Sequence, residues 1–275
     1  MSSYSSLRKS WGREIVRQDI PTAPNLVFLI LLILTTLAVV VPFLPAMPSE
    51  GLDPSWQFGI NQALAQGLVL GRDIVFTFGP YASIYTRVYH PATDHLMFWG
   101  AMYFAVSFIL VAYINYKSSH WFLKLGFLAL LSTIVHTMDS LLFYYALSVG
   151  VCLHKAIISR AIDQLSKRAL VTTLLLLFAP FGLLPLIKGS ALAAVVATAA
   201  FSAFMLVKEQ RRDLAVIVWF VVLISMSLFW IIADQPISAL PSYLKSMFPI
   251  TSGYTEAMAI NGDGAEPLFY MGASI

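Results

Sequence analysis

The feature that most constrains this chain is a series of apolar runs, each close to the thickness of a lipid bilayer. A helix needs about 20 predominantly apolar residues to cross the hydrocarbon core of a membrane. Only 11% of the 275 residues are charged, whereas a soluble domain carries about 25%. The sequence therefore predicts an all-α, polytopic bundle of about seven transmembrane helices: Asn25–Pro45, Leu96–Ile114, Trp121–Val135, Leu141–Ile158, Ala169–Ile187, Ala191–Val207 and Leu214–Ala233.

The third and fourth runs leave an alternative open. Trp121–Val135 is short, and only residues 136–140 separate it from the next run. These two segments could form a re-entrant pair that is buried in protein instead of two crossings. Both alternatives return the chain to the same side of the membrane, so the sidedness of every later segment is unaffected.

The distribution of basic residues predicts the orientation, because Lys and Arg are enriched in cytoplasmic loops. With the N-terminus in the cytoplasm, 13 of the 17 basic residues lie on the cytoplasmic side, and the outer side holds only Arg72, Arg87, Lys188 and Lys245. We therefore expect a cytoplasmic segment (1–24), a transmembrane module (25–233) with a long outer loop (47–95), and an outer C-terminal segment (234–275) without another helix. The first run lacks an Ala-x-Ala cleavage site after it, which favours a retained signal anchor.

Several classes of function are excluded or left without support. The cytoplasmic loops are too short for a nucleotide-binding domain, and no G-x-x-x-x-G-K-[ST] motif occurs. No basic tract exceeds a doublet, so nucleic-acid binding is not expected. Cys152 is the single cysteine, and no Cys/His spacing for zinc is present. A transporter or flippase would place ionisable groups in mid-span, whereas here they gather at the outer ends of the spans.

The long outer loop begins with the pattern of a helix. Asp53 followed by Pro54 suits a helix start, with an N-cap carboxylate and proline at the first helical position. Trp56, Ile60 and Leu64 recur at helical spacing and form an apolar stripe, while the opposite face is polar and uncharged. This segment is predicted to be an amphipathic helix that runs to about Gly67 at the membrane surface.

After this helix the loop concentrates charged and aromatic side chains. It reads Gly71-Arg72-Asp73, continues through Gly79-Pro80-Tyr81, and then contains Tyr85 and Arg87. An outer loop that opens with an Asp just past the first span, followed by an amphipathic helix and Gly-Arg-Asp, resembles the GT-C superfamily of membrane glycosyltransferases. The protein O-mannosyltransferases and the bacterial enzymes that add aminoarabinose to lipid A are of this kind. The resemblance covers about residues 51–91, and the order of seven spans agrees with the N-terminal part of that fold.

The resemblance implies transfer of a sugar from a polyprenyl-phosphate carrier to a lipid, glycan or protein acceptor on the outer face of the membrane, such as the bacterial inner (plasma) membrane. Such chemistry needs a carboxylate to deprotonate or orient the acceptor and cations to hold the departing phosphate. Asp53 and Asp73 are the candidate catalytic residues. The candidates for binding substrate or phosphate are Arg72, Arg87, Lys188, Tyr81, His136 and Asp139. The use of a divalent metal stays open, and no other cofactor is implied.

Each candidate also has a structural interpretation. Asp53 could simply cap its helix, and Asp73 could form a local ion pair or turn with Arg72. Lys188 could extend from the end of a span to the interface, and His136 and Asp139 could belong to a tight turn between two apolar helices. GT-C enzymes continue with further spans and an outer domain, so the chain could instead be a fragment, a non-catalytic membrane subunit, or a lipid or sugar transporter.

Overall fold

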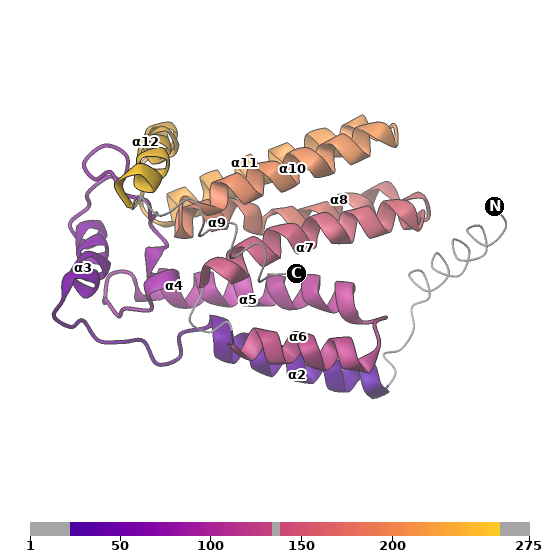
Figure 1. The fold of residues 1–275 in the computed structure, drawn as a ribbon. Helices are drawn as coiled ribbons and strands as arrows, with labels where there is room; N and C mark the ends of the chain where they lie inside the picture. Colours follow the sequence, from indigo (N-terminus) through magenta and orange to yellow (C-terminus); the bar gives the residue numbers. More distant parts are fainter. Residues whose placement is uncertain (1–22, 134–137, 259–275) are drawn as a thin grey trace, which may run out of the picture.

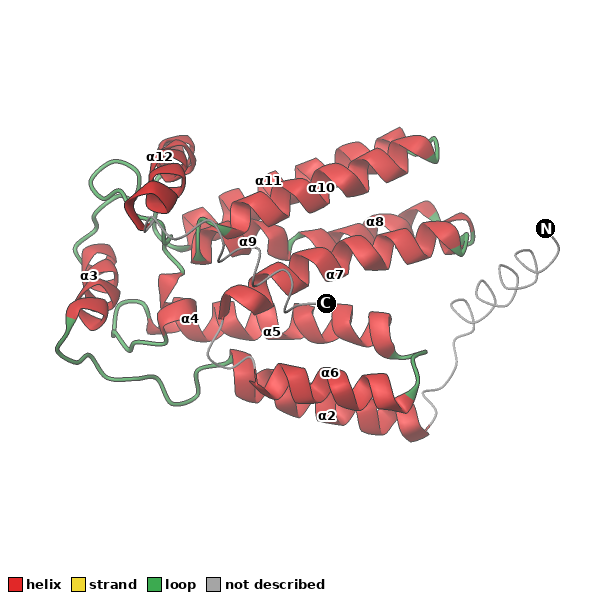
Figure 2. Ribbon diagram, viewed as in Figure 1, coloured by secondary structure: helices red, strands yellow, loops and turns green. Residues whose placement is uncertain are grey.

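The structure of the protein, a computed structural model, describes residues 23–133 and 138–258. These residues form helices and connecting loops, with no β-strand among them (Figure 2). Within these described residues, six segments are long and apolar enough to cross a membrane. They are α2 (Ala23–Val40), α5 (Asp94–Tyr116), α7 (Met138–Ile158), α8 with α9 (Lys167–Phe178 and Pro180–Ile187), α10 (Ala191–Lys208) and α11 (Arg212–Ile232). The prediction of an all-α, polytopic bundle is confirmed.

The remaining apolar run is shorter than a full crossing. It forms α6 (Trp121–Thr133), whose 13 residues extend about 20 Å, against a hydrocarbon core of about 30 Å. α6 packs against α2, where Lys124 Nζ donates to Asn25 Oδ1 at 2.7 Å. Within the described residues, the predicted span Trp121–Val135 is therefore the helix α6, which is too short to cross a bilayer by itself.

The bundle has two different ends, which Figure 1 shows at the left and right of the view. The loop-rich end carries α3 (Leu52–Ala65), α4 (Ala82–Thr86), the connecting segments between residues 41 and 93, and α12 (Leu240–Met258). The short-loop end carries the tight connections 117–120, 159–166 and 209–211. Four of the described basic residues belong to the loop-rich end, and the others lie at or near the short-loop end: Lys117, Lys124, Lys155, Arg160, Lys167, Arg168, Lys208, Arg211 and Arg212.

The α8–α9 segment is interrupted at Ala179 because Pro180 has no N–H to continue the hydrogen-bond ladder. The buried Tyr145 hydroxyl donates to Leu177 O near this interruption at 2.9 Å. After the interruption, α9 packs closely against α11. A Cβ on Gly182 would lie only 2.3 Å from Met226 N, so this glycine permits the close approach of the two helices.

The predicted outer-loop helix exists as α3, but its start differs from the expectation. Gly51 occupies the N-cap position, no side chain caps the helix, and Asp53 already lies in its first turn. The Asp53 carboxylate instead accepts a hydrogen bond from Trp56 Nε1 at 3.1 Å. The helix can begin one residue before Asp53 because the first four N–H groups of a helix have no internal partner, which makes Pro54 tolerable in the first turn.

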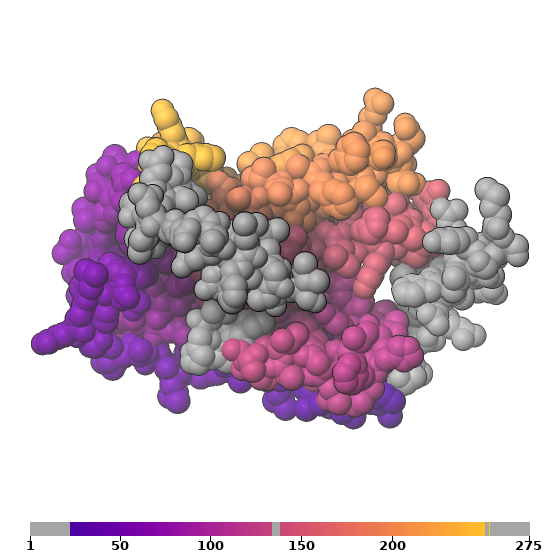
Figure 3. Space-filling view, viewed as in Figure 1, coloured from indigo at the N-terminus to yellow at the C-terminus, as the bar shows by residue number. Residues whose placement is uncertain are grey.

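The C-terminal segment corrects a second expectation, since residues 240–258 form α12. Leu240, Tyr243 and Met247 recur at helical spacing, and their side chains are buried. This stretch also contains polar residues and Pro249, which make it less apolar than a membrane span. For this reason the sequence alone did not indicate a helix here. Figure 3 shows α12 beside the segments of the long loop at the same end of the molecule.

α12 and the residues before it hold the long loop in place. The buried Gln235 side chain accepts from Leu70 N at 2.9 Å and donates to Leu68 O at 3.4 Å. Ser242 Oγ donates to Gly71 O at 2.6 Å, and the Tyr243 hydroxyl donates to Pro185 O at 3.0 Å. The loop-rich end is therefore an ordered layer in which segments from both halves of the sequence meet.

Candidate functional site

The strongest candidate for a functional site lies at the loop-rich end, around Lys188. This residue directly follows α9 and forms an isolated backbone bridge with Phe78. Its ammonium group donates to Asp139 Oδ2 at 2.8 Å and to the Tyr85 hydroxyl at 3.2 Å. The C-terminus of α9, the start of α7 and the short helix α4 thus contribute one residue each to a polar cluster.

The polar cluster, which consists of Lys188, Asp139 and Tyr85, is only partly satisfied. The Tyr85 hydroxyl also donates to Asp139 Oδ2, at 2.9 Å. Asp139 Oδ1 is buried and has no hydrogen-bond partner among the described residues. A buried carboxylate oxygen without a partner is costly and uncommon, so Oδ1 has unused capacity to accept a hydrogen bond.

The surroundings keep the lysine charged. Burial alone would lower the pKa of Lys188, but its hydrogen bonds to Asp139 and Tyr85 and the charge of Asp139 outweigh this effect and raise the pKa. Burial, as the largest cause, raises the pKa of Tyr85 above its ordinary value. The cluster therefore presents an ammonium group and a neutral phenol beside Asp139, with the Lys188 side chain 20% and the Asp139 side chain 38% exposed.

Aromatic rings line this cluster. Lys188 Nζ lies 4.6 Å from the ring centroid of Tyr85 and 5.4 Å from that of Phe78, within the range of cation–π attraction. Phe78 in turn stacks on Trp56 with a centroid separation of 4.8 Å. Because Trp56 Nε1 donates to Asp53, one continuous series of contacts joins Asp53 to Lys188.

Arg72 and Asp73 form a separate, exposed ion pair. Two guanidinium nitrogens donate to the Asp73 carboxylate at 2.9 Å each, and Val69 N donates to Asp73 Oδ2 at 2.9 Å. The hydrogen bonds from Arg72 and Val69 lower the pKa of Asp73 to about 2. Such a carboxylate is a weak base, and this geometry favours its role as the acceptor that closes a turn over one in catalysis.

Arg87 and Tyr81 make structural contacts. Arg87 has a left-handed backbone (φ 56°), and its guanidinium donates to Val39 O, in the last turn of α2, where carbonyls lack helical partners. Burial lowers the pKa of Arg87. The Tyr81 hydroxyl donates to Phe229 O at 3.0 Å, which ties the start of α4 to α11.

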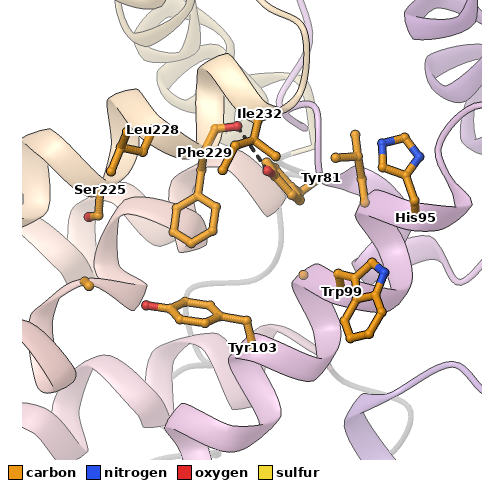
Figure 4. A pocket seen from close by; sticks show the side chains of 11 residues that line it. Tyr81, His95, Trp99, Tyr103, Ser225, Leu228, Phe229 and Ile232 are labelled. Carbon is orange, nitrogen blue, oxygen red and sulfur yellow. Dashed lines mark hydrogen bonds between the residues drawn. The ribbon is translucent and has the colours of Figure 1, made fainter.

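Tyr81 also lines an apolar pocket between α5, the junction of α8 and α9, and α11. The pocket has a volume of about 420 Å³, and its wall includes Trp99, Tyr103, Ala179 and Phe229. In Figure 4 the rings of Tyr103 and Phe229 lie next to each other in this wall, with centroids 5.3 Å apart, and Trp99 and His95 lie at one side. Trp99 is 67% exposed on a helix that is long and apolar enough to span a membrane, so the pocket borders the surface that would face lipid.

The structure thus brings together Lys188 and Asp139, which are 49 residues apart, and adds Tyr85, which the sequence analysis did not select as a site residue. Tyr85 lies one helical turn after Tyr81, but no local pattern indicates that it contacts Lys188. The structure does not join Arg72, Asp73 or Arg87 to the polar cluster by any contact, and Asp53 is linked to it only through rings. His136 lies outside the described residues.

Two further observations concern metal ligands and similarity to known proteins. Among residues 23–133 and 138–258, no group of three or more His, Cys, Asp or Glu side chains is placed to hold a metal ion. Comparisons of the chain with models of protein families, with curated proteins and with solved structures gave no match.

The fold and the apolar surfaces of its six long helices define the class: an all-α integral membrane protein with an ordered polar layer at one end of its bundle.

Proposed function

We propose that the protein is a membrane glycosyltransferase that moves a sugar from a polyprenyl phosphate to an acceptor at the loop-rich end. The polar cluster carries this proposal, because it combines a held cation with a carboxylate oxygen that lacks a partner. Lys188 would bind the phosphate of the carrier, with Tyr85 as a second donor. A part-buried ammonium group stabilises a departing phosphate more strongly than one in water.

The reaction requires one proton transfer. The hydroxyl of the acceptor attacks the anomeric carbon of the sugar, the bond from that carbon to the phosphate oxygen breaks, and the polyprenyl phosphate leaves. We assign Asp139, the carboxylate that contacts Lys188, to receive the proton of the acceptor hydroxyl. Asp53 was the residue expected in this role, and it stays a candidate, although its carboxylate is exposed and already accepts a hydrogen bond from Trp56.

The apolar pocket supports the use of a lipid-linked donor. Tyr81 lines the pocket, while Tyr85, one turn further along α4, belongs to the polar cluster. A lipid chain that enters the pocket from the bilayer would therefore bring its phosphate to the same end of the bundle as Lys188. Apolar walls that exclude water from such a chain supply binding free energy in proportion to the area they cover.

In the proposed orientation the N-terminus is cytoplasmic and the loop-rich end lies outside, as at the bacterial inner membrane, in accordance with the excess of basic residues at the short-loop end. Single cysteines at the exposed positions Ser55 and Ser166 test this orientation in intact cells. An impermeant maleimide should label the first and spare the second. The reverse pattern would contradict the orientation and, with it, transfer at the outer face.

The function itself is tested with purified protein in nanodiscs. The protein receives a polyprenyl phosphate that carries a radiolabelled sugar, together with an extract of membrane lipids and glycans as acceptors. Release of free polyprenyl phosphate coupled to labelled product is the expected result. Lys188→Met should lower the rate about 10²- to 10³-fold, whereas Lys245→Met, an exposed lysine at the same end, should not. Equal rates in both variants would refute the role of the polar cluster.

A lipid or sugar transporter is the second candidate, favoured by the interruption of a spanning segment at Ala179, which lines the pocket. Discontinuous helices often border the substrate of a transporter. Movement of the labelled carrier across proteoliposomes without loss of its sugar would favour this alternative over transfer.

A further inference from the structure

A group of three aromatic side chains joins the polar cluster to Asp53. Phe78 contacts both of the other rings, with centroid separations of 4.8 Å to Trp56 and 5.7 Å to Phe76. Trp56 and Phe76 also contact each other at 5.4 Å. α3 supplies Trp56, and the loop before α4 supplies the two phenylalanines.

The accessible surface of these three rings belongs mainly to Trp56 and Phe76. Phe78 is only 6% exposed, because Trp56, Phe76, Tyr85 and Lys188 all contact it. Trp56 and Phe76 are themselves only half-buried. Two partly exposed aromatic side chains thus lie one ring away from the ammonium group of Lys188, since Phe78 contacts all three.

Polar groups border these rings on both sides. The Asp53 carboxylate is fixed to the indole N–H of Trp56 and is exposed. Beyond Phe78 lie the Tyr85 hydroxyl, Asp139 and Lys188. A pyranose ring has one face of C–H groups, which pack on the negative face of an aromatic ring, and a rim of hydroxyls, which carboxylates bind.

We infer that Trp56 and Phe76 form a platform on which the transferred sugar packs while Lys188 holds its phosphate and Asp53 accepts hydrogen bonds from its hydroxyls. This inference rests on the proposed function, because the position of the phosphate at Lys188 directs the sugar toward the rings. It assigns a role to the first turn of α3 that differs from acid–base chemistry: recognition of the carbohydrate part of the donor.

Binding measurements separate the platform from the phosphate site. The probes are a polyprenyl phosphate and the same lipid phosphate carrying glucose or mannose, each titrated into protein in nanodiscs. The wild-type protein should bind at least one sugar-bearing form more tightly, by about 3- to 10-fold, the range that an aromatic contact supplies. Trp56→Leu and Phe76→Leu keep an apolar side chain but remove the ring, so both should lose this gain and keep the affinity for the bare lipid phosphate.

The controls distinguish the two proposals. Lys188→Met should weaken all the ligands, and Trp121→Leu, which changes a tryptophan near the short-loop end, should weaken none. If the sugar gain persists in both ring variants, or is equally lost in Trp121→Leu, the platform is overturned while the lipid-phosphate function stands. If Trp56→Leu weakens every ligand, Phe76→Leu alone decides between these outcomes. If the wild-type protein binds none of the lipid phosphates, the proposed function fails together with the platform.

Discussion

The connections between helices are held by different kinds of contact at the two ends of the bundle. At the short-loop end, charged pairs join the connections 159–166 and 209–211. Arg160 contacts Glu209 at 2.6 Å, and Arg211 contacts Asp163 at 3.0 Å. Lys167 and Asp213, at the starts of α8 and α11, pair at 3.0 Å. All of these side chains are 28% exposed or more, so water can replace each partner.

At the loop-rich end the corresponding contacts are mostly uncharged and buried. Gln235 and Tyr243, both at most 5% exposed, bind backbone groups of Leu70 and Pro185. Two ion pairs at this end are exceptions, Arg72–Asp73 and Lys188–Asp139. The lysine of the second pair is the less exposed of the two cations, and this pair leaves one carboxylate oxygen without a described partner.

This difference indicates which end of the bundle depends on precisely placed contacts. Exposed ion pairs contribute about 0.2–1 kcal/mol each, because solvent screens them and compensates for their loss. A buried hydrogen bond that loses one partner costs about 1–3 kcal/mol. The short-loop end should therefore tolerate substitution, and the loop-rich end should not.

The largest effect is expected for the carboxylate of the polar cluster. Asp139→Asn should lower the rate of sugar transfer by about 10²- to 10⁴-fold, the usual contribution of a general base. Asp163→Asn, at the short-loop end, provides the matched control and should change the rate less than twofold. Transfer assays in nanodiscs measure both, and a similar loss in the two variants would contradict the contrast between the ends.

Gly71→Ala should cause the largest loss of stability. Gly71 has φ +82°, and an added Cβ would lie 2.3 Å from Tyr243 N, so strain and overpacking act together. We expect a loss on the order of 3 kcal/mol, measured from thermal unfolding in detergent. Gly59→Ala, in α3, meets nothing within 4 Å and should leave the unfolding midpoint equal or higher. A neutral Gly71→Ala would show that α12 does not pack on the loop as described.

Gln235→Ala tests the buried hydrogen bonds of the loop. It removes the acceptor of Leu70 N, which lies in the buried layer between the loop and α11. The expected loss is about 1–3 kcal/mol of unfolding free energy, together with faster hydrogen exchange at the Leu70 amide. The exposed Gln66→Ala is the control for the loss of a glutamine side chain. Unchanged exchange at Leu70 would argue against this contact.

Arg160→Gln should have a small effect on stability, although it removes contacts to both Glu209 and Asp163. We expect a loss of less than about 1 kcal/mol, which becomes smaller in 1 M salt because the Debye length is then only about 3 Å. Thermal unfolding at low and high salt measures this. A large, salt-independent loss would mean that the two ends are stabilised alike.

The smallest effect is expected for Asp73→Asn, and it should depend on pH. The folded pKa of about 2 lies below the ordinary value, so the ionised carboxylate stabilises the folded state above about pH 4. This contribution should fade as the pH falls toward 2. The difference in unfolding midpoint between wild type and variant should therefore shrink between pH 5 and pH 2.5. A difference that grows on acidification would contradict the pairing with Arg72.

The sequence by itself determined the architecture, because apolar length and helical periodicity are local properties. The bundle of spanning helices, the helix that contains Trp56 and Ile60, and the separation of most basic residues from the long loop all follow from counting along the chain. The predicted start of α3 was wrong by two residues, since Gly51 and not Asp53 occupies the N-cap position and no side chain caps the helix.

Only the tertiary structure decided which of the charged residues meet. Lys188 contacts Asp139 and Tyr85 across 49 and 103 residues, whereas Arg72 pairs with its neighbour Asp73. In the sequence, Arg72 and Lys188 were equally good candidates for binding a phosphate. The choice depends on how α4, α7 and α9 pack, and on the apolar contacts of α12. Packing between distant segments depends on the shape of whole surfaces, so no spacing along the chain encodes it.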